Sequence, residues 1–329
     1  MTRLSLGDRL KYSLTQPHYP DVGIEFNSDV IRLAAVSAEK GALRVEHLDT
    51  EPLPAGAIDP NPFKTNIHDM EVVAEALKRL WSRNPIRTEN VCLLLQDRSA
   101  LTFHVNLEQP AGNRQECYDL IRFKLKKSVP FRIEEAQINI FDLAGASQFS
   151  GTTFWTVVMN QAVLHQYEQF IQSTIDAECG LVDLSTFNLM NLTHSTVMTQ
   201  ALQTQDLLFV NLNREYIATA ISQKGNLMFY RSRPLERQNA LFEEALGEIY
   251  PTTMFYVDKL EGKALARAFV YSVENPSDLA TQIQNNLNFP AAAIAPEQIL
   301  RFRPDIREKR VHEFAPLLGL VVSRKVEFQ

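Results

Sequence analysis

The chain has 329 residues, of which 45% are hydrophobic and 22% charged, so it has enough apolar material for roughly two globular domains. Its formal net charge of −6 argues against a general nucleic-acid binder, which usually carries a basic domain. Of its 12 glycines the closest pair is Gly145 and Gly151, a spacing that excludes the Gly-x-Gly-x-x-Gly and Walker-type loops of dinucleotide-binding and P-loop proteins.

The cysteine and histidine content indicates a reducing compartment and no metal site. Cys92, Cys117 and Cys179 are isolated and odd in number, which fits buried thiols better than a disulfide framework. No Cys-x-x-Cys or His-x3-His spacing points to zinc. The N-terminus lacks the apolar run of a signal peptide, and no stretch approaches the ~20 apolar residues of a membrane span. We therefore expect a cytoplasmic protein.

The chain begins with a basic segment, residues 1–20, in which Leu6, Leu10 and Leu14 recur at every fourth position. This spacing places the leucines on one face of a short helix that ends at the prolines that follow. Two interpretations stay open. The segment is either a docking arm or frayed lead, or an amphipathic helix at a membrane surface.

An internal duplication follows. Residues 22–48 predict three strands joined by a Phe-Asn-Ser turn and a Lys-Gly turn. Residues 207–231 predict three strands joined by a Leu-Asn-Arg turn and a Lys-Gly turn in the same order. An amphipathic helix is predicted after each of these meanders, at residues 67–81 and at about 235–249. The shared order of elements favours duplication over chance repetition.

Strands and helices alternate through the rest of the chain. The further predicted strands are residues 91–96, 101–107, 137–143, 154–160 and 266–273. The further predicted helices are residues 115–127, 163–178, 184–198, 252–260 and 277–287, with a final segment at 313–324. This alternation indicates α/β architecture, and two duplicated halves with an insertion in the first predict a bilobed protein with a cleft.

A basic stretch lies on the predicted helix at 115–127 and just beyond it. Residues 121–132 contain no acid, and their basic members are Arg122, Lys124, Lys126, Lys127 and Arg132. They are interleaved with apolar residues, so the stretch is either an ordinary charged helix face or a patch that attracts an acidic peptide or anionic lipid headgroups. A second cluster, at residues 301–310, is diluted by acids and favours a solvated face.

These motifs, in this order, resemble the PilM-like proteins of type IV pilus assembly, within the actin/FtsA superfamily. The matching segments are VGIE at 22–25, EPLPAGAI at 51–58, VAEALKRL at 73–80, RF at 122–123, VPF at 129–131, EE at 134–135, DLSTF at 183–187 and APLLGL at 315–320. The resemblance runs from about Asp21 to the C-terminus.

The resemblance implies an actin-like (ribonuclease H-like) duplicated bilobed α/β fold with an FtsA-type insertion subdomain. The implied units are an N-terminal arm at 1–20, a first lobe at 21–105, the insertion subdomain at 106–180, a return to the first lobe at 181–204, a second lobe at 205–310 and a C-terminal helix at 311–329 that returns to the first lobe.

Actin-type ATPases hold nucleotide with three loops, and this chain departs from the family pattern in all of them. The corresponding residues are Glu25, Asn27 and Ser28 in the first loop, Asn211 and Asn213 in the second, and Glu274 and Asn275 in the third. An asparagine side chain projects where a phosphate should lie, and Asn211 cannot act as a carboxylate towards a cation. We therefore expect no catalytic residue, no ATP hydrolysis and no cofactor, while residual nucleotide binding stays open.

The resemblance further implies a non-enzymatic cytoplasmic scaffold of a type IV pilus or type II secretion-like inner-membrane machine. Such proteins capture the cytosolic N-terminal tail of a single-span, PilN-like protein between the first lobe and the insertion subdomain, and are thereby peripheral to the inner membrane. Other pilus-machine components are further expected partners, and nucleic acid is not. The predicted groove walls are residues 101–107 and 121–131, with Phe103, Val105, Arg122, Phe123, Lys126 and Phe131.

Two alternatives accompany this prediction. One is an actin-like ATP-binding protein or ATPase with altered phosphate loops, which would use ATP and Mg²⁺. The other is an FtsA-like membrane tether, which depends on residues 1–20.

Overall fold

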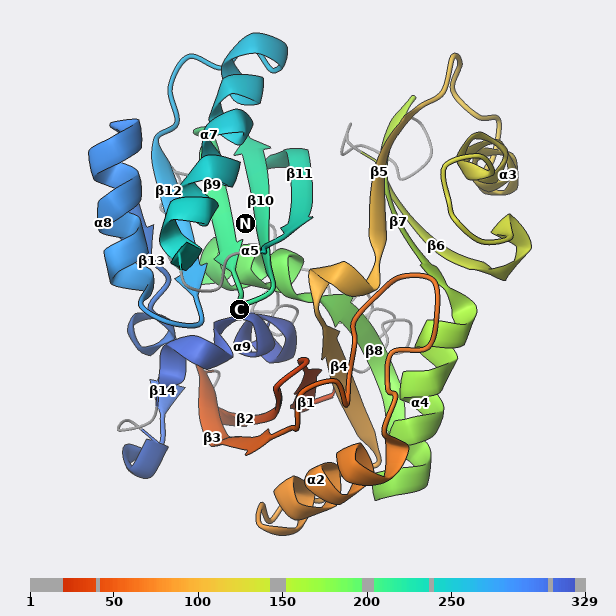
Figure 1. Cartoon of the computed structure of the whole chain (residues 1–329), viewed down its shortest axis with the longest axis vertical. Coiled ribbons are helices and arrows are strands. Elements are labelled where there is room, and N and C mark those ends of the chain that lie inside the picture. Colours follow the sequence, from red (N-terminus) through yellow and green to blue (C-terminus); the bar gives the residue numbers. More distant parts are fainter. Residues whose placement is uncertain are drawn as a thin grey trace, which may run out of the picture.

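A computed structural model describes residues 20–39, 42–142, 152–196, 204–236, 240–306 and 310–322 (Figure 1). The described residues form three β-sheets with helices packed on them, which is a mixed α/β architecture. The predicted N-terminal arm, the first Lys-Gly turn at 40–41 and the end of the C-terminal segment lie outside the described residues.

The first lobe is built on a six-stranded sheet of order β14-β3-β2-β1-β4-β8. Its strands are β1 (Val22–Phe26), β2 (Val30–Glu39), β3 (Ala42–Pro52), β4 (Asn90–Leu95), β8 (Glu178–Leu184) and β14 (Arg301–Phe302). β1 pairs antiparallel with β2 and parallel with β4. On one face, α2 (Met70–Ser82) and α4 (Gln161–Ile175) bury apolar side chains against β1, β2 and β4.

The second lobe repeats this arrangement. Its five-stranded sheet has the order β11-β10-β9-β12-β13. The strands are β9 (Leu207–Leu212), β10 (Tyr216–Gln223), β11 (Asn226–Pro234), β12 (Arg267–Ser272) and β13 (Ala291–Ala293). β9 pairs antiparallel with β10 and parallel with β12, as β1 does with β2 and β4. The two halves therefore share the same strand topology, as the duplication in the sequence predicted. α7 (Leu241–Lys259) and α8 (Pro276–Leu287) cover its outer face.

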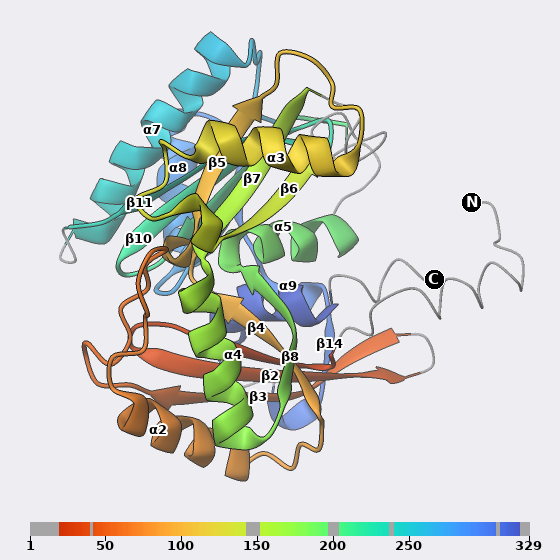
Figure 2. The ribbon, with the colours of Figure 1, turned by 90° about the vertical axis from the view of Figure 1, so that its right-hand side faces the viewer.

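Two helices form a layer between the lobes. α5 (Ser185–Thr196) and α9 (Ala315–Val322) lie between the two sheets (Figure 2). Their apolar side chains share one core with β2 and β4 on one side and with β9, β10 and β12 on the other. A Cβ atom at Gly319 of α9 would lie 1.9 Å from the carbonyl oxygen of Asn188 in α5, so only glycine allows this approach of the two helices.

A small three-stranded sheet of order β5-β7-β6 stands beside the second lobe. It contains β5 (Leu101–Asn106), β6 (Ala136–Asp142) and β7 (Thr153–Asn160), and α3 (Arg114–Leu125) covers one face. Trp155 of β7 donates from its indole nitrogen to the carbonyl oxygen of Leu227 in β11 at 2.8 Å, which ties the sheet to the second lobe.

The family resemblance implied an insertion subdomain at residues 106–180. The unit built on the small sheet has different bounds at both ends. Its first strand already begins at Leu101. At the other end, α4 buries Tyr167 and Phe170 in the core of the first lobe, and β8 pairs with β4. The apolar spacing of α4 identifies a helix, but it does not indicate which sheet the helix covers.

Two helices predicted at about 235–249 and 252–260 are one helix in the structure, α7, and Pro251 lies inside it. The prediction of a break was wrong because proline usually ends a helix by removing an N–H and by crowding the residue four positions earlier. In the structure α7 nevertheless continues through Pro251 and buries residues on both sides of it, among them Ile249 and Thr252. Among the described helices, none combines the length and the hydropathy needed to cross a bilayer.

Candidate functional site: the cleft between the lobes

A pocket of about 420 Å³ opens where equivalent turns of the two lobes meet. The β1–β2 turn contributes Ser28 and Asp29, and the β9–β10 turn contributes Asn213 and Arg214. Ligand sites of open α/β sheets lie at the ends of strands in this way, so the cleft is the candidate site.

The first loop is held by buried polar contacts. The backbone N–H of Asn27 donates to the carbonyl oxygen of Val30 at 3.0 Å, which closes the turn. The side-chain oxygen of Asn27 accepts from Nε2 of Gln96 at 2.9 Å. Within the described part of the chain, Nδ2 of Asn27 and Oε1 of Gln96 are buried without a partner. The loop therefore keeps polar capacity for a water or a ligand.

Glu25, at the end of β1, is neutralised within its own lobe. Its carboxylate lies 3.1 Å from Nη1 of Arg32 in β2, and both side chains are buried. Burial lowers the pKa of Arg32, but the charges of Glu25 and Glu313, the neighbouring Tyr271 and the Glu25 hydrogen bond together outweigh that effect and raise it, so the guanidinium stays protonated. The Glu25 carboxylate is thus engaged by an arginine rather than directed into the pocket.

Asn211, the equivalent residue of β9, reaches across to the first lobe. Its Nδ2 lies 3.0 Å from Oδ2 of Asp97, 3.0 Å from the hydroxyl of Ser185 and 2.9 Å from that of Thr186. Asn213 donates from Nδ2 to the hydroxyl of Tyr216 at 3.0 Å. Both asparagines therefore act as structural donors, and Asn211 joins the lobes.

Asp97 is the centre of this network, and the sequence analysis missed it. It lies in a short turn after β4 and is 1% exposed. Burial raises its pKa, and hydrogen bonds from Thr186 and Tyr216 partly offset the rise. Its position directly after a buried parallel strand is the signal that could have identified it, because such positions line the clefts of α/β proteins.

The third loop does not belong to the pocket lining. Asn275 caps α8, since its side-chain oxygen accepts from the backbone N–H of Asp278 at 3.3 Å, and Pro276 starts the helix. The N–H of Glu274 bonds to the hydroxyl of Ser272 at 3.3 Å. Of the predicted loop residues, Ser28 and Asn213 line the pocket, whereas Glu274 and Asn275 serve the start of a helix.

Ion pairs bridge the mouth of the cleft. Arg214 of the second lobe lies 3.0 Å from Asp29 of the first, and Arg98 lies 3.0 Å from Glu215. The Arg214–Asp29 pair is exposed and the Arg98–Glu215 pair half-buried, and ion pairs near the surface contribute about 0.2–1 kcal/mol each. The buried contacts of Asp97 therefore matter more for joining the lobes than these surface pairs.

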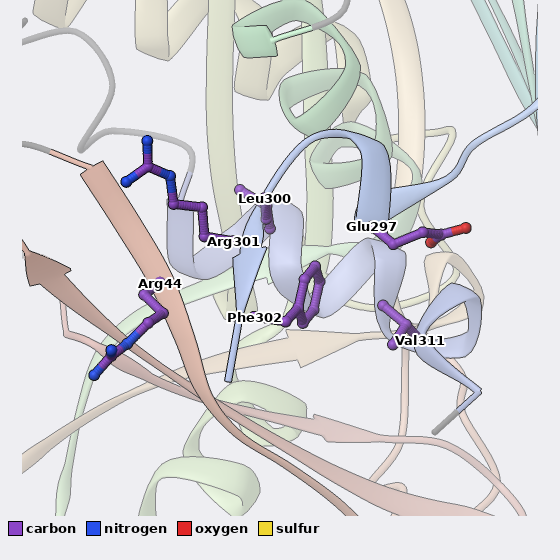
Figure 3. Close-up of a pocket in the computed structure, with 6 residues that line it drawn as sticks. All are labelled: Arg44, Glu297, Leu300, Arg301, Phe302 and Val311. Carbon is purple, nitrogen blue, oxygen red and sulfur yellow. The ribbon is translucent and has the colours of Figure 1, made fainter. Parts of the chain in front are cut away.

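A second cavity, of about 600 Å³, lies beside β14 (Figure 3). Its lining residues are Arg44, Glu297, Leu300, Arg301, Phe302 and Val311. Figure 3 shows the guanidinium groups of Arg44 and Arg301 pointing away from each other and away from Leu300, Phe302 and Val311. Because it lacks polar groups that converge on one point, this cavity is a weaker candidate than the cleft.

The predicted partner-groove residues separate into two groups. Val105 is 5% exposed, and Phe103 and Phe131 pack against the same core beneath α3. Arg122 lies at the edge of this core, where it donates to the carbonyl oxygen of Ile133 at 2.8 Å and stacks over the ring of Tyr118.

Phe123 and Lys126 lie on the outer side of α3. The Phe123 side chain is 79% exposed, and Lys126 is exposed as well. Since β5 and α3 pack directly on each other, the structure does not bring all six predicted residues into one groove.

The described residues contain no group of three or more His, Cys, Asp and Glu side chains that could hold a metal ion. Cys92 and Cys117 are buried, and Cys179 is half-buried. Burial raises the pKa of the Cys92 and Cys179 thiols to about 12, so both are unreactive at neutral pH.

Comparison with known proteins identifies relatives. The family model for type IV pilus assembly protein PilM matches residues 23–238. A solved PilM–PilN type IV pilus biogenesis complex is similar with a TM-score of 0.75 at 14% identity, over 94% of this chain and 99% of that one. This likeness confirms the predicted actin-like fold.

Two further solved structures are similar at lower scores. A Bacteroides thetaiotaomicron protein with an actin-like ATPase fold and unknown function has a TM-score of 0.48 at 9% identity, over 94% of this chain and 98% of that one. The cytoplasmic domain of Epsl, an inner-membrane component of the type II secretion system of Vibrio cholerae, has a TM-score of 0.48 at 11% identity, over 92% and 95%.

Proposed function

Because the chain belongs to the PilM family of type IV pilus assembly proteins, we propose that it is a non-enzymatic scaffold that binds the cytosolic tail of a PilN-like membrane protein. The observation that carries this proposal is the family match over residues 23–238, supported by the fold shared with a PilM–PilN complex. Through its partner the scaffold lies at the cytoplasmic face of the inner membrane, where it contacts other components of the pilus machine.

The residues at the nucleotide-loop positions support the non-enzymatic part of the proposal. Phosphoryl transfer needs a free acid for the metal ion and backbone amides around the phosphates. Glu25 is paired with Arg32, and the amide of Asn211 donates to Asp97. The residues present therefore do not supply the free acid that hydrolysis needs, and we infer that the chain does not hydrolyse ATP.

β5 offers an extended tail a free sheet edge. In the described part of the chain, β5 pairs only with β7. The N–H of Leu107 bonds to the carbonyl oxygen of Thr152, so the alternation of an antiparallel ladder directs the backbone groups of Thr102, His104 and Asn106 away from β7. A tail that adds to this edge gains main-chain hydrogen bonds without disturbing the sheet.

The outer face of α3 supplies a second contact for the tail. An exposed phenylalanine such as Phe123 is a typical interface anchor, because its apolar area becomes buried on binding. Lys126 and Lys127 beside it are exposed and attract acidic residues of the tail.

A matched pair of variants tests the β5 edge. His104→Pro removes one outward N–H and the imidazole, whereas His104→Ala removes the imidazole alone. Proline is tolerated where the N–H of an edge strand faces solvent, so both variants should fold. We expect the tail peptide of a PilN-like protein to bind His104→Pro about tenfold more weakly than His104→Ala by calorimetry.

Phe123→Ala and Lys126→Glu test the α3 face in the same titration, and each is expected to weaken binding. Equal affinity for His104→Pro and His104→Ala, together with unchanged binding by both α3 variants, would overturn this placement of the tail. Failure of the unaltered chain to bind the tail at all would overturn the proposed function itself.

ATP binding without hydrolysis is the second candidate function. The observation that favours it is the unpaired, buried Nδ2 of Asn27 and Nε of Arg32 beside the 420 Å³ pocket. Thermal unfolding with and without Mg-ATP tests it. A stabilisation that Asn213→Lys abolishes would support nucleotide binding in the cleft.

A further inference from the structure

α7 has an apolar face that the described part of the fold leaves exposed. Tyr250, Met254 and Val257 are 55%, 40% and 52% exposed. Their spacing of four and three residues places them in one line along the helix. Gly247 lies one turn earlier on the same line, and a Cβ atom placed on it would have no neighbour within 4 Å. The helix surface at Gly247 is therefore also open.

This line is separate from the face by which α7 packs on its sheet. Ala245, Ile249 and Tyr256 are buried in the core of the second lobe. A helix that only covers a sheet is polar on its remaining surface. Contiguous exposed apolar side chains mark an interaction site in a soluble protein.

Carboxylates stand at both ends of this line. Glu243 lies one turn before Gly247, and Asp258 follows Val257; both are exposed, and no ion pair is found for either within the described residues. By the helical period of about 3.6 residues, Lys259 lies on the other side of the helix. The apolar line is therefore flanked by one carboxylate at each end.

We propose that this α7 stripe, formed by Glu243, Gly247, Tyr250, Met254, Val257 and Asp258, binds an amphipathic helix of a partner protein that carries basic residues near both of its ends. The stripe is about 21 Å long, the length of four helical turns. A helix matches this straight line at the same spacing, and Gly247 allows it to approach closely.

The charges select this partner over two others. If a second copy of the chain paired through the same stripe, an acid would face an acid at each end in either orientation of the two helices. An anionic membrane surface is repelled for the same reason. Basic residues on a partner helix are attracted by both ends.

The stripe is independent of the surface proposed for the tail. Figure 1 shows α7 on the second lobe, separated from β5 and α3 by β10 and β11. Both partners can therefore be bound at the same time, and variants of one surface serve as controls for the other.

Two synthetic helical peptides of about 18 residues provide the probes. Both carry leucine at alternating three- and four-residue spacings; one has lysines at its ends and the other has glutamates. We expect the full chain to bind the lysine peptide about tenfold more tightly than the glutamate peptide in a fluorescence titration at low salt. The double variant Glu243→Lys/Asp258→Lys should reverse this preference.

Tyr250→Ser/Met254→Ser should weaken binding of the lysine peptide about tenfold, whereas Phe123→Ala should leave it unchanged. All substituted side chains are exposed, so thermal unfolding should show that the variants fold. The proposal would be overturned if the charge-reversed variant kept the preference for the lysine peptide, or if the serine variant bound that peptide as tightly as the unaltered chain. The proposal would also be overturned if the unaltered chain sedimented as a dimer and Met254→Ser as a monomer, because the stripe would then pair with a second copy of itself.

Discussion

Asn211 and Glu25 hold equivalent positions in the two lobes but have different partners. Glu25 bonds to Arg32 in the neighbouring strand of its own lobe, whereas Asn211 donates to Asp97 of the other lobe. One position therefore stabilises a single sheet and the other joins two. Because a buried carboxylate is unfavourable without donors, Asp97 favours the arrangement of lobes that brings Asn211 and Tyr216 to it.

Asn211→Asp tests this role. The change removes a donor and places a second carboxylate about 3 Å from Oδ2 of Asp97, where two negative charges cannot both be accommodated. We expect the free energy of unfolding at neutral pH to fall by about 1–3 kcal/mol.

Part of this loss should return as the pH falls. In the folded variant the two acids repel each other, which raises their pKa above that in the unfolded chain. The folded variant therefore binds more protons than the unfolded chain, and it gains stability as the pH falls from the folded pKa to the unfolded pKa. Urea unfolding of Asn211→Asp and of the uncharged control Asn211→Ala measures the difference. Identical pH profiles for the two variants would contradict the account.

Gly319 is a second residue whose environment leads to a firm prediction. Gly319→Ala brings a Cβ to 1.9 Å from the backbone of Asn188, so α5 and α9 must separate, and we expect a loss of about 1–3 kcal/mol or more. Gly247→Ala in α7 meets open space and should instead gain about 0.5–1 kcal/mol through helix propensity. Chemical denaturation of both variants makes the comparison, and equal effects would contradict the predicted contact.

At the residue level, the sequence predicted some of the cleft. Both asparagine turns follow apolar strands at matching places, so Asn27 and Asn211 could be predicted there. The partners of Asp97 could not, because they depend on which strand ends meet across the lobes. The pairing of Arg32 with Glu25 could not either, because it depends on the register of β1 and β2. No periodicity in the sequence carries that information.

At the level of elements, α2 is held to β3 by two arginines. Nε of Arg83 donates to Asp49 at 2.9 Å, and Nε of Arg79 donates to Glu51 at 2.8 Å. Burial raises the pKa of Asp49 and of Glu51, but the hydrogen bonds to each acid and the charges of the arginines together outweigh it, so both pKa values are lowered. The contact therefore stabilises the fold when the acids are ionised.

This contact predicts a dependence of stability on pH. An acid whose folded pKa lies below its unfolded value contributes stability above the unfolded value, about 4, and loses it as the pH falls through the folded one. Thermal unfolding of the unaltered chain should lose stability from pH 5 downwards, and Arg83→Ala should flatten that slope. A slope that stays the same in Arg83→Ala would show that Asp49 and Glu51 do not cause it.

Elements with a strong pattern were predictable, and short or interrupted ones were not. The two meanders have apolar runs bounded by turns, and their strands appear in the structure. β13 and β14 contain only three and two residues, too few to show alternation. The sequence divided α7 at Pro251 because proline usually ends a helix, whereas α7 buries residues on both sides of Pro251 and continues through it.

At the scale of the whole molecule, the strand order of the second sheet repeats that of the first except for the extra edge strand β14, and α5 and α9 form a layer between the two sheets. The duplication was predictable because each half repeats the same pattern. The limits of the small sheet were harder to predict. β5 pairs within the small sheet and α4 packs in the core of the first lobe, and local sequence patterns do not show with which unit an element packs. The result is a cleft whose loop positions are occupied by contacts between and within the lobes, and a separate sheet in which β5 pairs only with β7 among the described residues.

The central claim is that this chain binds a PilN-like tail without using ATP. The most direct measurement is calorimetric titration of the tail peptide into the chain with and without Mg-ATP, with phosphate release followed in the same samples. We expect the same affinity in both titrations and no phosphate release above the protein-free control. Tail binding that requires Mg-ATP, or phosphate release that the tail stimulates, would contradict it.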